Sequence, residues 1–364
     1  MRTKVLCIID TLGMGGAERQ MIGLALLLKQ KGYTAELVTY YNDDFYHGLA
    51  ERCGIEIITL HARDNKFSKL WNIARHIRKS GGYDWVIAYK DGPCVISCIL
   101  KILGAKYGLI VSERNTNKIL SNRDRIKFFL YRWADYIVPN SHSQEVFVKK
   151  NFANLKNKLV TITNFTDTEY FLPVRFYEND RLIVMTAARI AEQKNVINYL
   201  KSIRMLKDNG IRNVKFEWYG DVQPGEENYG EQVLELMNSL DIVDMISFYP
   251  ATIDIRSCYQ KADIFCLPSI YEGFPNVICE AMSCGKPIVC SRVCDNPTIV
   301  KEFKNAVLFD PHDVLSIYQG LKQLIEMPFQ ERMEWGAVSR DIAVSMFSQE
   351  TFVQKYIKLL ERWF

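Results

Sequence analysis

The chain has 364 residues, 48% of them hydrophobic and 24% charged, and its formal net charge is +4. Because this length exceeds the size at which a single hydrophobic core stops growing, we expect two domains. No apolar run reaches the roughly 18 residues of a membrane span and no apolar leader follows Met1, so we exclude an integral membrane protein and expect a cytoplasmic one.

Short apolar strands alternate with helical runs along the chain. In the first half we predict a helix at 17–31 and strands at 4–10, 34–40, 84–89, 109–112, 136–140 and 160–163. In the second half we predict strands at 182–187, 214–219, 245–248, 264–267, 287–290 and 306–309. This α/β alternation is typical of parallel sheets, so the two sets predict two doubly wound, Rossmann-like domains. The polar segment 164–174 contains Pro173 and lies between them, where a linker is expected.

The positive charge is concentrated in the first half. Residues 1–170 contain 25 Lys and Arg against 16 Asp and Glu, whereas residues 171–364 contain 21 against 26. Two basic stretches, 67–79 and 123–138, have apolar residues at helical spacing, namely Phe67, Leu70, Trp71, Ala74 and Ile77, and Ile126, Phe129, Leu130, Trp133 and Ile137.

These two basic stretches have more than one interpretation. They are either ordinary solvated helices packed on a core, or a surface for anionic lipid head groups or a lipid diphosphate acceptor. The second interpretation implies peripheral contact with the inner face of the cell membrane. Nucleic acid is not expected as a partner, because no recognition-helix pattern or aromatic-rich basic strand accompanies the charge.

A glycine-rich loop joins the first predicted strand to the first predicted helix. It contains Gly13, Gly15 and Gly16, and glycine allows a backbone to approach a ligand closely. As a dinucleotide-binding fingerprint the loop is incomplete, because Glu18 occupies the position of the third glycine. Only Glu36, an acidic residue at about the expected distance further along the chain, supports that interpretation. A purely structural turn is the other interpretation.

Two cations follow the first strand of the second set. Arg189 and Lys194 are five residues apart, in the segment 187–195. Cations placed in this way after a strand can hold a diphosphate. A loop with two solvated cations is the alternative.

The most informative segment is 268–285, which contains Glu272 and Glu280 with seven residues between them. Gly273 and Pro275 predict a tight turn, residues 276–282 predict a helix, and Gly285 predicts its C-terminal cap. The carboxylates are then at most about 12 Å apart along the helix axis, which suits the span from a ribose to a diphosphate-linked sugar. The free N–H groups and the dipole of the helix start favour an anion there. Plain surface carboxylates are the alternative.

In Glu272-Gly273-Phe274-Pro275-Asn276 and the spacing to Glu280, the chain resembles the retaining glycosyltransferases of family 4, which have the GT-B fold. The resemblance covers nearly the whole chain and implies two Rossmann-like domains facing across a cleft. It implies an acceptor-binding domain at 1–168, a nucleotide-sugar-binding domain at 169–346, and a last helix at about 347–364 that crosses back. The implied reaction is retaining transfer of a sugar, by family frequency a UDP-linked hexose or N-acetylhexosamine, to a polysaccharide or lipid-linked glycan.

The resemblance also implies roles for individual residues. Glu272 would lie beside the transferred sugar as a positioning residue, and Glu280 would hydrogen-bond the ribose. Arg189 and Lys194 would contact the phosphates. Further donor contacts are implied for Gly15, Gly16, Gly220, Gly273, Phe274, Pro275, Asn276 and Val277.

The chain departs from the family pattern at two places. Ala188 replaces the usual glycine before Arg189. Many members carry a His near the transferred sugar, whereas this chain has Ser112-Glu113-Arg114-Asn115, which is similar to a tetrad in members that build bacterial surface polysaccharides. Glu113, Arg114 and Asn115 thus become candidate acceptor contacts, with a structural ion pair as the alternative.

No cofactor or metal ion is expected. The chain has no Asp-x-Asp pair to chelate a diphosphate through a metal. Its ten cysteines lack a Cys-x-x-Cys pair, which indicates reduced, mostly buried thiols rather than a zinc site.

Two other classes of function stay open. One is another nucleotide-sugar enzyme such as an epimerase, or a dehydrogenase if the first glycine loop held a dinucleotide. The other is a non-catalytic scaffold of the same architecture. The joint presence of Arg189, Lys194, Glu272 and Glu280 argues against the scaffold.

Overall fold

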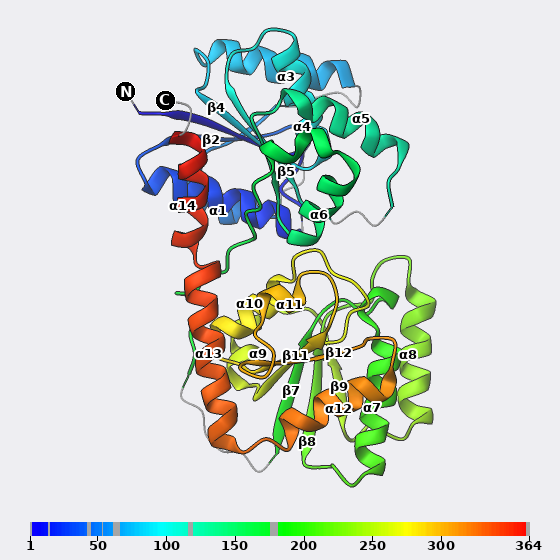
Figure 1. Cartoon of the computed structure of the whole chain (residues 1–364). Coiled ribbons are helices and arrows are strands. Elements are labelled where there is room, and N and C mark those ends of the chain that lie inside the picture. Colours follow the sequence, from blue (N-terminus) through cyan, green and yellow to red (C-terminus); the bar gives the residue numbers. More distant parts are fainter. Residues whose placement is uncertain are drawn as a thin grey trace. The chain divides into compact units, whose positions relative to one another are not determined.

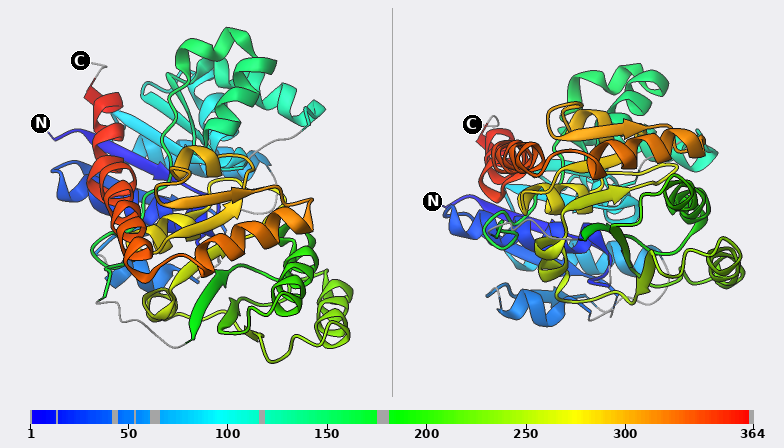
Figure 2. Two further views of the ribbon diagram at one scale, coloured as in Figure 1. Left: turned by 60° about the horizontal axis from the view of Figure 1, so that its bottom comes forward. Right: turned by 90° about the horizontal axis from the view of Figure 1, so that it is seen from below.

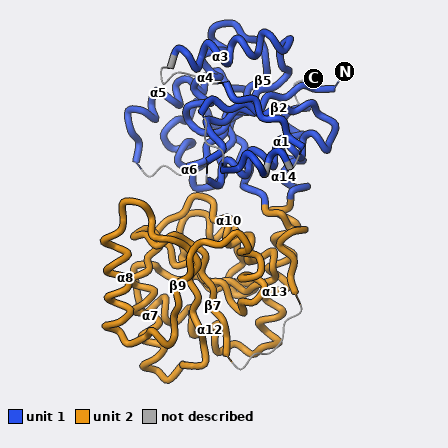
Figure 3. Tube along the Cα trace, turned by 180° about the vertical axis from the view of Figure 1, so that it is seen from behind, with its two compact units in different colours: residues 1–165, 349–364 blue, residues 166–348 orange. Residues whose placement is uncertain are grey.

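The computed structural model describes residues 2–13, 15–41, 45–52, 54–60, 66–115, 119–174 and 181–361. The chain divides into two compact units, one of residues 1–165 with 349–364 and one of residues 166–348 (Figure 3). The sequence predicts these boundaries after residues 168 and 346.

The first unit contains a parallel six-stranded sheet in the order β3-β2-β1-β4-β5-β6 (Figure 1). Its strands are β1 (Lys4–Ile8), β2 (Thr34–Thr39), β3 (Ile57–Thr59), β4 (Trp85–Tyr89), β5 (Gly108–Glu113) and β6 (Tyr136–Pro139). Its helices are α1 (Gly16–Gln30), α2 (His47–Arg52), α3 (Lys66–Lys79), α4 (Asp91–Ile102), α5 (Asn122–Leu130), α6 (His142–Asn151) and α14 (Gln349–Glu361). One face of the sheet forms a core with α1 and α14, and the other face forms a core with α3, α4 and α5.

The second unit has the same architecture, with the strand order β12-β11-β10-β7-β8-β9. Its strands are β7 (Leu182–Ala187), β8 (Val214–Tyr219), β9 (Ile246–Tyr249), β10 (Ile264–Leu267), β11 (Ile288–Ser291) and β12 (Ala306–Phe309). Its helices are α7 (Val196–Asp208), α8 (Glu227–Ser239), α9 (Ile255–Lys261), α10 (Asn276–Ser283), α11 (Asn296–Ile299), α12 (Val314–Ile325) and α13 (Phe329–Phe347). Helices α7, α8 and α12 share one core with the sheet, and α9, α10 and α13 share the other, so both faces are covered (Figure 2).

In each sheet the first strand in the sequence is a central one. The next strands are added on one side of it, and the chain then crosses over and adds the remaining strands on the other side. β1 lies between β2 and β4, and β7 lies between β8 and β10. Loops that leave the two adjacent strands at such a switch point diverge to opposite faces, and the crevice between them is where open α/β sheets bind ligands. Gly15 follows β1, Lys194 follows β7 and Glu272 follows β10, so these predicted residues lie at the switch points.

The predicted α/β fold is confirmed, and most strands differ from the prediction by one or two residues at either end. Two strand assignments were wrong. β3 was not predicted, because it has three residues and is only partly buried. Residues 160–163 are not a strand, although Val160 and Ile162 donate backbone hydrogen bonds to Ile137 and Pro139 at 3.0 and 3.1 Å.

The second basic stretch also differs from the prediction. Its helix, α5, ends at Leu130 and is followed by a 3₁₀ turn (Tyr131–Trp133) and β6, so the helical period is broken. Ile126, Phe129 and Trp133 are exposed and do not form a core stripe.

The last helix, α14, belongs to the first unit. The predicted apolar stripe is buried there against α1 through Phe352, Tyr356, Leu359 and Leu360. Trp363, predicted on the same stripe, lies outside the described residues. Of the helices in the described ranges, none is both long and apolar enough to traverse a bilayer.

Candidate active site

The loops after β7 and β10 bring a cation and a carboxylate together. Lys194 lies at the end of a 3₁₀ turn (Glu192–Lys194) that follows β7, and its Nζ is 2.5 Å from Glu272 Oε1. Ser269 Oγ donates a hydrogen bond to the same oxygen at 2.6 Å. Glu272 is only 8% exposed. Two predicted site residues therefore form an almost buried ion pair at the switch point of the second sheet.

Hydrogen bonds from the neighbours of Lys194 hold these two loops in register. The Gln193 carbonyl accepts from the backbone N–H of Ile270 at 2.8 Å, and the Gln193 side-chain amide donates to the carbonyl of Tyr271 at 2.9 Å. Asn195 adopts a left-handed conformation with φ 61°, which Asn tolerates better than most residues. Its Nδ2 donates to two backbone carbonyls at 3.1 and 2.7 Å.

Arg189 differs from Lys194 in its surroundings. It is the second residue after β7, and its side chain is exposed. Within the described part of the chain, its guanidinium has no hydrogen bond or ion pair. This guanidinium is consequently available to an anion at the carboxyl end of the sheet.

Glu280 lies on the buried side of α10, the helix that follows Glu272. Tyr259 Oη donates a hydrogen bond to Glu280 Oε2 at 3.0 Å. The helix ends at Ser283, one residue beyond the predicted end, and Gly285, with φ 72°, lies just after its C-cap, Cys284. Of the residues at its start, Phe274 is buried in the core against Phe347, Pro275 is buried, and Gly273, Asn276 and Val277 are partly buried.

Gly220 lies where β8 ends beside β7. A Cβ at this position would lie 2.1 Å from the Ala188 carbonyl oxygen, so only glycine fits. The Gly220 N–H donates to the carbonyl of Tyr249 at 2.9 Å. The rings of Tyr219 and Tyr249 stack next to it, with centroids 4.9 Å apart.

In the first unit, ion pairs connect the region around the glycine loop after β1 to Lys90, the residue that follows β4. Gly15 is the N-cap of α1, Gly16 is its first residue, and a Cβ on Gly15 would lie 2.3 Å from Glu18 Oε2. The buried Glu18 pairs with Lys90, whose Nζ is also 2.9 Å from Asp10 Oδ1. Burial alone would lower the pKa of Lys90, but the two carboxylates outweigh it and raise that pKa.

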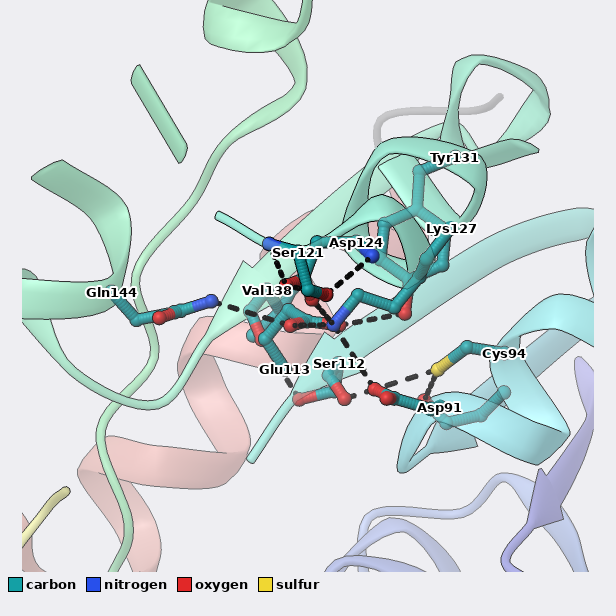
Figure 4. Close-up of polar contacts among 11 residues, drawn as sticks. Asp91, Cys94, Ser112, Glu113, Ser121, Asp124, Lys127, Tyr131, Val138 and Gln144 are labelled. Carbon is teal, nitrogen blue, oxygen red and sulfur yellow. Dashed lines mark hydrogen bonds and ion pairs between the residues drawn. The ribbon is translucent and has the colours of Figure 1, made fainter. Parts of the chain in front are cut away.

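Glu113 is the centre of a buried network (Figure 4). It is 2% exposed, accepts from Lys127 Nζ at 2.8 Å, from Tyr131 Oη at 2.6 Å and from Gln144 Nε2 at 3.3 Å. Lys127 also lies 3.1 Å from Asp91 Oδ1. Burial raises the pKa of Glu113 against the opposing charge of Lys127. These contacts favour a structural ion pair, and acceptor binding by Glu113 stays a prediction.

Arg114 and Asn115 come directly after this network. Arg114 Cζ lies 3.6 Å from the centroid of the Tyr89 ring, and its Nη1 donates to Asn164 Oδ1 at 2.9 Å. Asn115 is exposed. Arg114 has no carboxylate partner among the ion pairs of the described residues.

Several residues that support the site were missed in the sequence. Their side chains hold the predicted residues in place, and they are Gln193, Asn195, Tyr259, Ser269 and Lys127. Asn195 had a weak signal, because Asn adopts the left-handed conformation more readily than most residues. The other four donate hydrogen bonds to residues that are distant in the sequence, or that no helical or strand periodicity connects to them.

The described residues contain no group of three or more His, Cys, Asp or Glu side chains placed to bind a metal ion. Nine cysteines are free thiols, and Cys53 lies outside the described residues. The loops after β7 can instead supply positive charge from Arg189 and Lys194 to a departing diphosphate. Glu272 and Glu280 can accept hydrogen bonds from hydroxyl groups.

Residues 169–341 match the family described as Glycosyl transferases group 1. The chain is 28% identical to a Campylobacter jejuni α-1,4-N-acetyl-D-galactosaminyltransferase named for a diNAcBac-PP-undecaprenol-linked substrate, over 77% of this chain and 76% of that protein. It is 24% identical to a second protein of that organism, an N-acetylgalactosamine-N,N'-diacetylbacillosaminyl-diphospho-undecaprenol 4-α-N-acetylgalactosaminyltransferase, over 87% of this chain and 89% of the other.

Solved structures share the fold over the whole length. A glycosyltransferase from Rickettsia africae superposes with a TM-score of 0.88 at 17% identity, covering 99% of this chain and 98% of the other. Anabaena HepE in complex with UDP and glucose superposes with a TM-score of 0.83 at 19% identity, covering 99% of this chain and all of the other.

Proposed function

We propose that this chain, a glycosyltransferase with the GT-B fold whose residues 169–341 form a group 1 glycosyl transferase domain, transfers a sugar from a UDP-linked donor to a lipid-linked glycan with retention of configuration. The observation that carries the donor assignment is the Lys194–Glu272 pair, together with the exposed Arg189 on the same loop after β7. It places positive charge and a hydroxyl acceptor together at a switch point, where open α/β sheets bind ligands.

In this proposal the second unit holds the donor. Arg189 and Lys194 bind the diphosphate and stabilise the charge that develops on it as the glycosidic bond breaks. Glu272 accepts hydrogen bonds from the transferred sugar, and Glu280 accepts them from the ribose. Gly220 allows the end of β8 to pack against the Ala188 carbonyl, directly before Arg189, and Gly273 allows the donor to approach the turn before α10 closely. Because side-chain cations supply the charge, the reaction is metal-independent.

The choice of donor and acceptor is supported by the related proteins. HepE was solved with UDP and glucose, and the two Campylobacter proteins are named as N-acetylgalactosaminyltransferases with undecaprenol-linked substrates. We infer a UDP-hexose or UDP-N-acetylhexosamine as donor and a diphosphate-linked glycan as acceptor. The first unit binds this acceptor, with Arg114 and Asn115 as contacts.

The proposed acceptor is carried by a lipid, and α3 has features that suit a membrane surface. Phe67 and Trp71 on this helix are 83% and 65% exposed. They border a groove of about 760 Å³ between α3 and α4, which is also lined by Leu70 and Leu103 and by the cation Arg78. α3 contains no acidic residue. Exposed aromatic side chains next to cations fit the interface of an anionic bilayer.

A calorimetric titration tests the donor assignment. UDP, GDP and their common sugar conjugates are titrated in the presence of EDTA into the wild-type chain, Glu280→Ala and Glu235→Ala. Glu235 is an exposed carboxylate on α8 and serves as the matched control. We expect UDP to bind the wild type and the control alike and to bind Glu280→Ala more weakly. Binding of NAD(H) in place of any UDP compound contradicts the proposal, and binding of no nucleotide favours a scaffold.

Retention is tested separately, on the slow hydrolysis of the donor without acceptor. Proton NMR of freshly released sugar should show the α anomer before mutarotation. The β anomer as first product contradicts retention.

A further inference from the structure

We infer that Arg114 is a phosphate-binding residue, and that its ligand is a phosphate group of the acceptor. The inference starts from the orientation of its guanidinium. One face of the group lies on the ring of Tyr89, with Cζ 3.6 Å from the ring centroid, and Nη1 is held by Asn164 Oδ1 at 2.9 Å. The remaining donors are Nε and Nη2, which lie on the same edge of the guanidinium plane and point in the same direction.

This edge has no acceptor among the described residues. Nε and Nη2 are both enclosed, and neither has a hydrogen-bond partner. Enclosed donors without acceptors are costly, and native proteins pair nearly all of them. Two parallel N–H groups on one edge of a guanidinium match the two oxygens of a phosphate or carboxylate.

The charge of Arg114 is also uncompensated, in contrast to its neighbours. Lys90, at the end of the adjacent strand β4, pairs with Asp10 and Glu18. Lys127 pairs with Glu113 at 2.8 Å. Among the described residues, Arg114 has a ring contact with Tyr89 and a hydrogen bond to Asn164, both neutral, and no ion pair with a carboxylate. Of these three cations, it is therefore Arg114 that is suited to an anion from outside the chain.

The supports of Arg114 are themselves fixed. Tyr89 is fully buried and its hydroxyl lies 2.9 Å from that of Tyr356 on α14. Asn164 is buried and precedes Phe165, whose backbone N–H and carbonyl are both hydrogen-bonded by Gln20 at 2.9 and 2.8 Å. The guanidinium edge is thus oriented before any ligand arrives, which lowers the cost of binding.

Phosphate in this system has two sources, the acceptor and the donor. We assign it to the acceptor because Arg114 belongs to the first unit, whereas the cations Arg189 and Lys194 of the proposed donor site belong to the second. This part of the inference rests on the proposed function. The binding of phosphate by Arg114 does not.

The test uses the full chain labelled with ¹⁵N-arginine and follows the Nε–H signals of its arginines by NMR during a titration with inorganic phosphate. Saturating UDP is present to occupy the donor site. The Arg114 signal is identified by its loss in Arg114→Lys, and that of the exposed Arg123 on α5 by its loss in Arg123→Lys. We expect the Arg114 signal to shift to saturation and the Arg123 signal to drift only slightly.

A second measurement is the calorimetric affinity for phosphate under the same conditions. Arg114→Lys keeps the charge but not the paired donors, so its affinity should fall by about tenfold, while Arg123→Lys should match the wild type. An Arg114 signal that stays still, or drifts linearly like that of Arg123, overturns the phosphate site. An Arg114 signal that shifts with UDP alone, with no further effect of phosphate, overturns the acceptor assignment. Failure of UDP to bind contradicts the proposed function. In that case the phosphate titration still tests whether Arg114 binds phosphate.

Discussion

Lys194 Nζ lies 2.5 Å from Glu272 Oε1, so the cation proposed for the donor diphosphate is bonded to the carboxylate proposed for the donor sugar. A diphosphate must therefore compete with Glu272 for Lys194. The competition separates the two roles, because removing the charge of Glu272 should lower sugar transfer without lowering nucleotide affinity.

Glu272→Gln should lower turnover by about 100-fold, because the transferred sugar loses a charged hydrogen-bond acceptor. UDP affinity should stay the same or increase, because Lys194 no longer has a carboxylate partner. Calorimetry with UDP and a donor-turnover assay measure the two effects. Ser269→Ala, which removes the other hydrogen bond to the same oxygen, is the control and should change both values less. A parallel loss of UDP affinity in Glu272→Gln contradicts the separation of roles.

Lys194→Met should lower the unfolding free energy by about 3 kcal/mol, because it leaves the nearly buried Glu272 carboxylate without its cation. Combining it with Glu272→Gln should recover much of this loss, since no unpaired charge remains. Urea unfolding of the two single variants and the double variant gives the coupling between them. Additive losses would show that the two side chains do not depend on each other.

Tyr259→Phe should weaken UDP binding about fivefold, because the Tyr259 hydroxyl donates to Glu280 Oε2 and its loss corresponds to roughly 1 kcal/mol. Turnover at saturating donor should not change. Tyr199→Phe is a matched control, since Tyr199 is another fully buried tyrosine of the second unit and belongs to the core on the other face of the sheet. If both variants bind UDP like the wild type, Tyr259 does not orient Glu280.

Lys286 should make the stability of the second unit depend on pH. The residue is fully buried, and burial lowers its pKa to about 7 from an ordinary value of 10.5, although the neighbouring Cys284 and Asp263 act in the opposite direction. Between these two values the unfolded chain binds more protons than the native one, so the unfolding free energy rises with pH by at most about 1.4 kcal/mol per pH unit.

Lys286→Met should remove this pH dependence. The difference in unfolding free energy between wild type and variant should grow in favour of the wild type between about pH 7 and pH 9, as measured by urea unfolding at each pH. Lys201→Met, at an exposed position on α7, is the control. Parallel profiles for the wild type and Lys286→Met would contradict the prediction.

Replacing both Phe67 and Trp71 by Ser should weaken binding to phosphatidylglycerol vesicles by about tenfold or more, because two exposed aromatic side chains are lost from the proposed interface. Co-sedimentation measures the bound fraction. Val146→Ser, on α6 of the same unit, removes an exposed apolar side chain elsewhere and should have little effect. Unchanged binding of the double variant would show that α3 is not the contact surface.

The strands were largely predictable because a buried parallel strand is a continuous apolar run with polar ends. The strands at 264–267 and 306–309 agree with β10 and β12 to the residue. The short, partly buried β3 has too little apolar character for that signal. The stripe at Ile126 and Phe129 misled the prediction, because exposed apolar residues on a helix cannot be told from core residues by spacing alone.

The positions of the site residues came from motif spacing, but their partners did not. Lys194 and Glu272 are 78 residues apart in the chain, and they meet only because β10 pairs with β7 in the sheet. The burial of Glu113 likewise depends on Lys127 and Tyr131, which α5 and the turn after it place over the end of β5. Such contacts follow from strand order and helix placement, which a local pattern does not encode.

The placement of α14 has a consequence for how the protein is made. The core of the first unit needs Phe352, Tyr356 and Leu360, which pack on α1 although more than 300 residues separate them from it. A chain emerging from the ribosome thus completes the second unit's segment, 166–348, while the first unit still lacks one of its helices. The core of the first unit therefore cannot be completed, and part of its apolar surface stays uncovered, until the last helix has been translated.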